Sequence, residues 1–207
     1  MGSKSISSYN VGKMKLFLQI MHLLLFFLMA SCNLNEIGTP NKNTDSNLQY
    51  GSDLSITKLM EDYGGVYKID GIEKEGLQIF KENGYSWTRL RLFHTPEIKG
   101  QVCNDLPYTL ELARRAKHFG FKVLLDIVYS DTWADPGHQS VPGAWKELRL
   151  DILQDSVYLY TKRVIDVMTN AGLQPDMVQI GNEINNGFLW PEGYLWVEGG
   201  NAKWDNL

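Results

Sequence analysis

The sequence has little of several features that would point to particular classes of protein. It holds only 2 cysteines in 207 residues, so no framework of disulfides is expected. The formal net charge is −4, without the basic excess that marks nucleic-acid-binding proteins. There is no G-x-G-x-x-G turn, no phosphate loop, no zinc-ligand spacing and no motif for a serine or cysteine nucleophile. We therefore expect no cofactor, no metal site and no nucleic-acid partner.

Long hydrophobic runs are also scarce, and the one that occurs lies at the N-terminus. A lysine, an apolar run over 16–30 and small residues come after Met14, as in a secretory signal peptide, and the run is short for a membrane span. "MASC" (29–32) is similar to a bacterial lipobox, which predicts a lipid anchor on Cys32; an ordinary signal peptide is the alternative. We expect a signal peptide over 1–31 that starts at Met14, and a secreted or cell-surface location.

The remainder of the chain has the composition of an ordered globular domain. Hydrophobic residues make up 43% of the sequence and charged residues 21%. Residues 32–49 are polar and rich in asparagine, as in a flexible tether, which leaves 50–207 as the domain. Most of the tryptophans lie between Trp133 and Trp204, where they could serve core packing or hold the apolar faces of sugar rings.

Strand and helix patterns alternate along this domain. They are typical of strands at 86–93, 121–130 and 177–181, and of helices at 107–119 and 147–169. Each helix-to-strand junction carries a glycine (Gly84, Gly120, Gly172), which suits a left-handed helix cap. This βαβαβαβ order favours a parallel sheet with right-handed crossovers. An open doubly wound sheet and a (β/α)8 barrel both fit it.

The loops distinguish the two architectures. Polar and aromatic residues gather after the strand ends, in "RLRLFHTP", "YSDTWADPGHQ" and "GNEINNGFLWPEGY". Chemistry at the carboxyl ends of several parallel strands is the barrel pattern. We therefore predict an α/β fold of the (β/α)8 TIM barrel type. A complete barrel needs about 250 residues, so this chain is expected to hold only its N-terminal half, about four βα units.

Glu183 and its neighbour Asn182 are the leading candidates for catalysis. A carboxyl group at the mouth of an apolar barrel is partly desolvated, and its pKa tends to rise, as a general acid requires. Asn182 could hydrogen-bond a sugar hydroxyl. Alternatively, the two side chains cap the next helix.

Arg89 and Arg91 lie on one face of the second strand, and an arginine that points into a barrel must meet an anion. We expect Arg91, nearer the strand end, to orient a catalytic carboxylate. For Arg89 a structural ion pair with Asp126 is an equally good interpretation.

The segment after the third strand offers candidate contacts to sugar. Asp131 and Asp135 could accept hydrogen bonds from hydroxyl groups, while Trp133 and Trp145 could stack on rings. Asp135 also starts an Asp-Pro-Gly turn. His138 stands near both aspartates without a recognised ligand spacing, so no metal is expected there.

Together, "GSDLSITKLMEDYGG", "RLRLF", "YSDTWADPGHQ" and "GNEINNGFLWPEG" resemble family 53 glycoside hydrolases, the arabinogalactan endo-β-1,4-galactanases. The resemblance runs from about Tyr50 to the last residue. It implies a (β/α)8 barrel that hydrolyses β-1,4-galactan side chains of pectin with retention of configuration. It places the acid/base on Glu183, with Asn182 as its partner.

The resemblance also implies what this chain lacks. It places the nucleophile on a second glutamate, at the end of a seventh strand, and we assign no residue here to that role. "DIVYSD" (126–131) stands where the family usually has "DFHYSD", so Val128 takes the position of a histidine. Phe93 stands where many relatives have tryptophan. Two alternatives stay open: another retaining β-glycanase, such as a mannanase or cellulase, and a non-catalytic glycan-binding surface lipoprotein.

Overall fold

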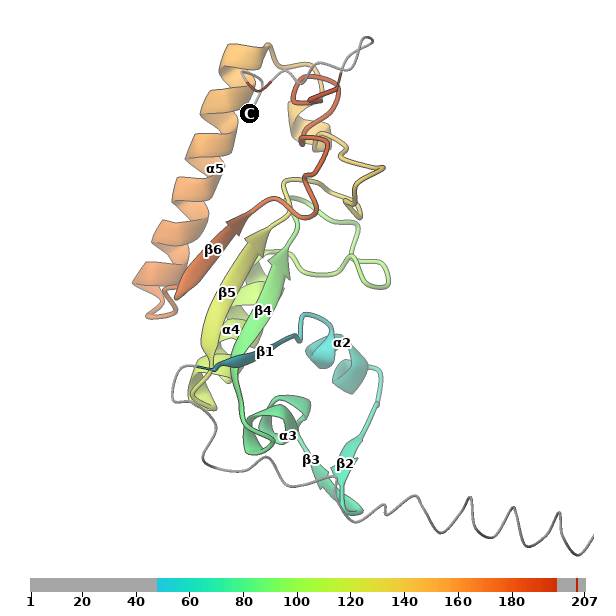
Figure 1. Ribbon diagram of the computed structural model, residues 1–207, viewed down its shortest axis with the longest axis vertical. Coiled ribbons are helices and arrows are strands. Elements are labelled where there is room, and N and C mark those ends of the chain that lie inside the picture. Colours follow the sequence, from blue (N-terminus) through green and yellow to red (C-terminus); the bar gives the residue numbers. More distant parts are fainter. Residues whose placement is uncertain (1–47, 197–203, 205–207) are drawn as a thin grey trace, which may run out of the picture. The chain divides into compact units, whose positions relative to one another are not determined.

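The computed structural model describes residues 48–196 and Trp204 (Figure 1). The predicted signal peptide over 1–31, the anchor at Cys32 and nearly all of the predicted tether lie outside these residues. No helix in 48–196 is both long and apolar enough to cross a membrane.

The central element is a four-stranded parallel sheet with the order β1-β4-β5-β6. Its strands are Tyr50–Asp53 (β1), Tyr85–Leu92 (β4), Lys122–Ile127 (β5) and Met177–Ile180 (β6). Helix α4 (Leu106–His118) links β4 to β5, and helix α5 (Leu150–Asn170), preceded by the short helix η2 (Gly143–Trp145), links β5 to β6. The predicted strands and helices are thus confirmed, with the parallel order expected for part of a (β/α)8 barrel.

The two faces of the sheet differ sharply in polarity. One face packs on the helices through side chains that are fully buried: Leu90, Leu92, Val123, Leu125, Ile127, and Leu112 and Ala116 of α4. The alternate residues of β4 point to the other face and include Arg89 and Arg91. Strand pairing places Arg91 beside Asp126, and Asp126 beside Gln179. The face away from the helices therefore carries a row of charged and amide groups.

The connection between β1 and β4 contains more helices and strands than the predicted alternation of one strand and one helix. Two short helices, α2 (Thr57–Asp62) and α3 (Gly76–Glu82), flank an antiparallel hairpin of β2 (Tyr67–Ile69) and β3 (Ile72–Lys74). Asp70 and Gly71 form its turn with φ values of 50° and 77°. Positive φ at both central positions is typical of the tight turn that joins two strands.

Glycine ends the helices as predicted. Gly84, Gly120 and Gly172 have φ values of 88°, 75° and 70°, in the left-handed region. A Cβ at Gly84 or Gly172 would meet nothing within 4 Å, so the backbone conformation, rather than crowding, requires glycine there. These tight turns lead the chain directly from each helix into the next strand.

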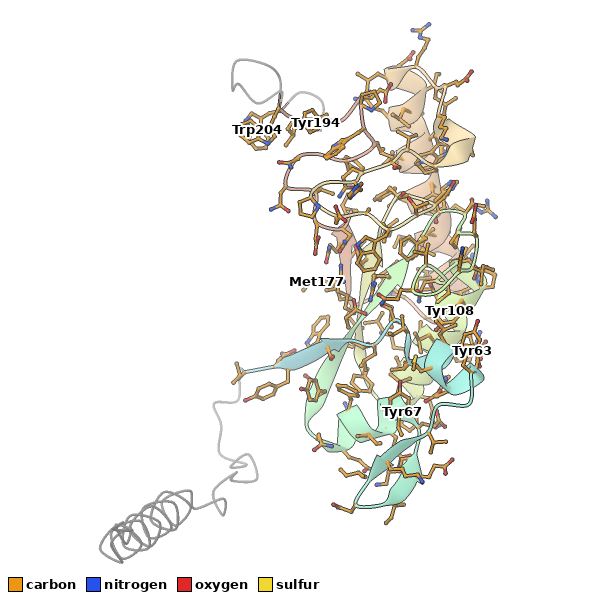
Figure 2. All side chains as sticks on the ribbon, turned by 90° about the vertical axis from the view of Figure 1, so that its right-hand side faces the viewer. Tyr63, Tyr67, Tyr108, Met177, Tyr194 and Trp204 are labelled. Atoms are coloured by element: carbon orange, nitrogen blue, oxygen red, sulfur yellow. The ribbon has the colours of Figure 1, made fainter. Side chains whose placement is uncertain are left out.

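The apolar strand β6 is largely exposed in the part of the chain that the structure describes. Met177 (labelled in Figure 2) is 53% exposed. Ile180 is 48% exposed. The reason is its place in the sheet, because β6 is an outer strand that pairs only with β5 among the described strands. An apolar strand at a sheet edge is a template for pairing with another chain.

We expect the 207-residue chain to self-associate through this edge. Lysine at Ile180 should reduce association, because charged side chains on an edge strand oppose pairing. Sedimentation velocity of the wild type and of Ile180→Lys measures the effect. Met60→Lys in α2 is the matched control, since Met60 is 46% exposed but lies on a helix. A monodisperse wild-type monomer, or an equal effect of Met60→Lys, would contradict the expectation.

Candidate active site at the carboxyl ends of the strands

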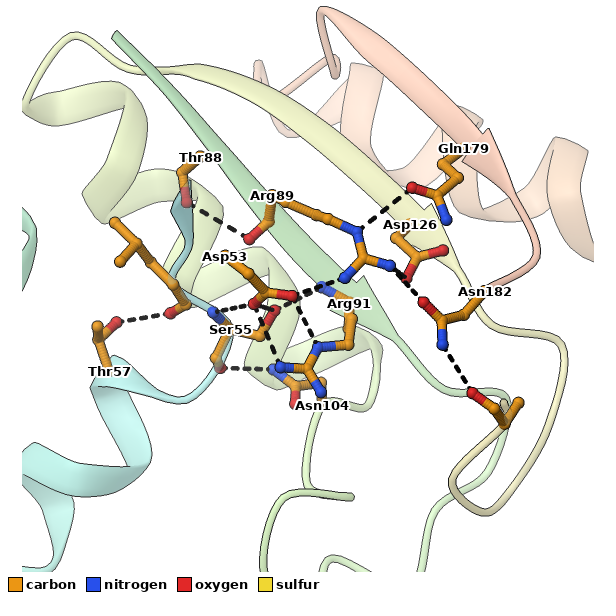
Figure 3. A network of polar contacts seen from close by, with 12 residues as sticks. Asp53, Ser55, Thr57, Thr88, Arg89, Arg91, Asn104, Asp126, Gln179 and Asn182 are labelled. Carbon is orange, nitrogen blue, oxygen red and sulfur yellow. Dashed lines mark hydrogen bonds and ion pairs between the residues drawn. The ribbon is translucent and has the colours of Figure 1, made fainter. Parts of the chain in front are cut away.

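Arg89 connects all four strands of the sheet through its guanidinium group (Figure 3). Nη1 donates to Asp53 of β1 at 2.7 Å, and Nη2 donates to Asp126 of β5 at 2.5 Å. Nε donates to the Gln179 side chain of β6 at 3.3 Å. The expected ion pair with Asp126 is confirmed, and its carboxylate is fully buried.

Arg91 pairs with the carboxylate of Asp53 in β1. Its Nε lies 3.0 Å from Oδ2 of Asp53, and its Nη2 donates to Oδ1 at 3.3 Å. Ser55 donates to the same carboxylate from its backbone nitrogen and its hydroxyl, at 3.0 and 2.6 Å. Burial would raise the pKa of Asp53, but the Ser55 hydrogen bonds and the charge of Arg91 outweigh it, so the pKa lies below its usual value. Asp53 therefore stays ionised between the two arginines.

The Asn182–Glu183 pair lies directly after β6. Asn182 is 6% exposed, and its side-chain oxygen accepts from Nη2 of Arg89 at 2.5 Å. Its amide nitrogen donates to the carbonyl of Ala134 at 2.6 Å. Glu183 has a φ of 53°, which a residue with a side chain adopts only at a cost of order 1–3 kcal/mol. This backbone turn separates the buried amide from the carboxylate next to it.

The Glu183 side chain is exposed, which corrects the expectation of a partly desolvated carboxyl group. The sheet described here reaches this residue from one side only, because β6 is an outer strand. Its backbone is nevertheless held in place. Gln139 donates from its side chain to the carbonyls of Asn182 and Glu183, at 2.8 and 3.4 Å.

The two aspartates predicted to bind sugar are engaged with the backbone. Asp131 accepts from the backbone nitrogens of Thr95 and Gly143, at 2.8 and 2.7 Å. Asp135 accepts from the nitrogen of Gly137 at 2.8 Å and lies 2.9 Å from Nδ1 of His138. These contacts lower the pKa of Asp135. Both carboxylates thus shape the loops, and only their remaining lone pairs are open to a ligand.

The two tryptophans of this segment have different environments. Trp133 is 40% exposed, and its ring lies 4.9 Å from the guanidinium carbon of Arg91. Trp145 is 8% exposed and packs edge-on against His94, with ring centres 4.4 Å apart. Burial lowers the pKa of His94, although Asp131 opposes the shift. The expectation that Trp145 offers a free stacking face is therefore wrong, while Trp133 keeps one.

The positions that differ from the family pattern form a small apolar cluster. Phe93 and Val128 are 1% and 2% exposed and pack with Ala134 beneath the loop. Ala134 also provides the carbonyl that holds the Asn182 amide. The apolar Val128 thus contributes packing at a position where a histidine would supply a polar group.

Sequence reasoning did not single out Asp53 or Gln139, although both hold the site together. A signal for Asp53 was present in "SDLS", because a carboxylate on the outer strand is the natural partner for two arginines on its neighbour. Gln139 gave no signal that distinguishes it from an ordinary loop residue. Within the described residues there is no group of three or more His, Cys, Asp or Glu side chains that could hold a metal ion.

Known proteins share sequence and fold with this chain. The pattern of glycosyl hydrolase family 53 matches residues 49–207. A protein of Aspergillus terreus named "Probable arabinogalactan endo-beta-1,4-galactanase A" is 43% identical over 69% of this chain and 40% of its own length. An "Arabinogalactan endo-beta-1,4-galactanase" of Humicola insolens is 41% identical over 70% of this chain and 43% of its own length.

A solved structure, the "Ignisphaera aggregans GH53 catalytic domain", superposes with a TM-score of 0.69 at 43% identity. It covers 74% of this chain, which spans 44% of that structure. The chain thus spans about two-fifths of the length of the relatives it matches, and its four parallel strands are part of a (β/α)8 barrel. The chain belongs to glycosyl hydrolase family 53.

Proposed function

We propose that this site takes part in the endo-hydrolysis of β-1,4-galactosidic bonds in the (arabino)galactan side chains of pectin. The observation that carries the proposal is the Asn182–Glu183 pair, which presents a buried, fixed amide and an exposed carboxyl group at the end of β6. Membership of a glycosidase family supports the reaction type. The names of the relatives support galactan as the substrate.

In the proposed mechanism Glu183 is the acid/base. It protonates the glycosidic oxygen as the bond breaks and then removes a proton from the water that releases the sugar. Asn182 binds a sugar hydroxyl through the amide hydrogen and the oxygen lone pair that its protein contacts leave free. Arg91 and its partner Asp53 supply fixed charge beside the reacting carboxylates.

Retention of configuration requires a second carboxyl group about 5 Å from the first. The resemblance to family 53 assigns it to a seventh strand, and the described sheet has four strands. No glutamate among the described residues is assigned as nucleophile. We therefore propose that these 207 residues bind galactan and supply the acid/base, but do not hydrolyse galactan alone.

We propose that Trp133 stacks on a galactosyl ring, with Asp131 and Asp135 as acceptors for its hydroxyl groups. Trp133→Ala is expected to weaken binding of linear β-1,4-galactotetraose about tenfold, the effect of losing one well-placed aromatic contact. Calorimetric titration of the 207-residue chain measures this. Trp204→Ala is the control, because Trp204 is 65% exposed and belongs to none of the loops described above. Tighter binding of manno- or cello-oligosaccharides than of galactotetraose would overturn the substrate assignment.

A non-catalytic glycan-binding protein is the second candidate, and the apolar Phe93–Val128–Ala134 cluster favours it. That cluster removes a polar group from the mouth of the barrel without disturbing the loop that Asn182 contacts.

We further propose export through the segment that starts at Met14 and a lipid anchor at Cys32. Cys32→Ser should release the protein from the cell surface, and unchanged membrane association would contradict the anchor.

A further inference from the structure

The amide of Asn182 is held in one orientation by contacts of opposite polarity. Its oxygen accepts from the Arg89 guanidinium, and its nitrogen donates to the Ala134 carbonyl. Turning the amide over would place its NH2 group against a cation and its oxygen against a carbonyl oxygen. Each of those contacts would be repulsive, so the direction of the amide is set by Arg89 and Ala134 together.

Arg89 in turn depends on Asp126. Nη2 carries two hydrogens, and it donates to Asp126 and to Asn182, both at 2.5 Å. The carboxylate of Asp126 therefore holds the same nitrogen that reaches the amide. The Asp126 side chain is fully buried, and its Oδ1 has no hydrogen-bond partner among the described residues. Protonation of this oxygen would therefore break no hydrogen bond of the described structure.

We propose that Arg89 and Asp126 are positioning residues for Asn182: ionised Asp126 holds the Arg89 guanidinium where it fixes the amide, and protonation of Asp126 loosens that hold. Only the use of the amide to bind sugar rests on the proposed function. The coupling of the three side chains stands on the geometry alone.

Burial and the charges around Asp126 place its protonation in a pH range in which it can be measured. Burial raises its pKa to about 6, the nearby carboxylate of Asp53 adds to the shift, and Arg89 and Arg91 oppose it. Tyr129, further along the same chain segment, also feels the Asp126 charge. Strand β6 faces it with the neutral amide of Gln179. The hold on Asn182 is therefore strongest well above pH 6 and weakens as the pH falls through that value, at which half of the Asp126 carboxyl groups are protonated. Ionised Asp53 still pairs with Nη1 of Arg89 in this range.

Nuclear magnetic resonance of the 207-residue chain tests the coupling directly. The side-chain amide of Asn182, Nε of Arg89 and the carboxyl carbon of Asp126 are followed between about pH 4.5 and 8. We expect all three signals to titrate with one shared midpoint near 6. In Asp126→Asn the Asn182 signal should no longer titrate. In Arg89→Lys the Asp126 carboxyl should still titrate while Asn182 ceases to follow it, because lysine has a single nitrogen.

Arg115→Lys is the matched control. Arg115 also bridges two carboxylates, Glu61 and Glu75, but does so among the helices rather than at the strand ends. It should leave the Asn182 titration unchanged. The proposal is overturned if the wild-type Asn182 amide does not titrate, if its midpoint differs from that of Asp126, or if it titrates equally in Asp126→Asn. The wild-type comparison needs no variant to fold.

Ligand binding separates this inference from the proposed function. Galactotetraose affinity should fall about tenfold between pH 7 and 5 in the wild type, as expected for one weakened polar contact, and should lose this dependence in Asp126→Asn. Absence of binding at every pH would overturn the proposed function, while the resonance titration would still decide the coupling. Binding whose pH dependence is the same in both proteins would overturn the positioning role and leave the proposed function intact.

Discussion

Replacement of Glu183 by glutamine is expected to reduce galactan hydrolysis by about 10²–10⁴-fold, the usual contribution of a general acid/base. Glutamine has nearly the same shape but can neither give a proton to the glycosidic oxygen nor take one from water. Since Glu183 is exposed and Gln139 contacts only its backbone carbonyl, the substitution should leave the stability of the fold unchanged.

The assay needs a complete barrel. A chimera that joins residues 49–207 to the C-terminal part of the Humicola insolens relative supplies the remaining strands. Reducing-sugar release from linear β-1,4-galactan is compared for the chimera and its Glu183→Gln variant. Glu192→Gln removes the same charge from the same loop and is expected to retain activity. Equal loss in both variants, or full activity of Glu183→Gln, would show that Glu183 is not the acid/base.

Replacement of Arg89 by methionine should destabilise the fold by about 3–5 kcal/mol near neutral pH, the cost of leaving a buried charge without its partner. The Asp126 carboxylate is fully buried and would lose its only ion pair closer than 4 Å in the described structure. Because Asp126 can escape this cost by taking up a proton, the loss should be larger at pH 8 than at pH 5. Urea unfolding at the two pH values measures both.

Two further variants test whether the unpaired charge of Asp126 causes the loss of stability in Arg89→Met. Adding Asp126→Asn to Arg89→Met removes the unpaired charge, so the double variant should be less destabilised at pH 8 than Arg89→Met alone. Arg115→Met should cost much less, because its partners Glu61 and Glu75 keep 21% and 52% of their side-chain surface in water. A loss that is independent of pH, or as large for Arg115→Met, would contradict a buried charge at Asp126.

The strands, helices and glycine caps could be predicted because each depends on local chemistry. Alternating residues in β4 separate a buried apolar face from Arg89 and Arg91, and Gly84 marks the turn that leads into this strand. The β2–β3 hairpin carried the Asp70–Gly71 turn signal, but its strands have only three residues each, too few to show a period. Short elements such as these depend on contacts that no local pattern encodes.

The partners within the site were harder to predict, because they depend on register and burial. The position of Arg91 nearer the strand end suggested that it would orient the catalytic carboxylate, and that role stays a prediction. In the structure Arg89, rather than Arg91, contacts Asn182, because Nη2 of Arg89 donates hydrogen bonds to both Asp126 and Asn182. Residue type indicated a sugar contact for Trp145, but packing buries its ring. Asp131 accepts two backbone hydrogen bonds, so its contact to sugar stays a prediction that rests on its remaining lone pairs.

Val128 bears on the choice between catalysis and binding alone. Its burial with Phe93 and Ala134 leaves the Asn182 contacts intact. The missing polar group favours binding alone, whereas the intact Asn182 contacts favour catalysis. Galactan hydrolysis by a complete barrel decides between the two.

The most direct measurement is product analysis of the 49–207 chimera on linear β-1,4-galactan, β-mannan and cellulose, with the anomeric configuration followed by nuclear magnetic resonance. We expect galacto-oligosaccharides whose reducing ends first appear as the β-anomer, because a double displacement retains configuration, and no comparable release from mannan or cellulose. A folded chimera that leaves galactan intact, releases the α-anomer first, or prefers mannan or cellulose would contradict the proposed function.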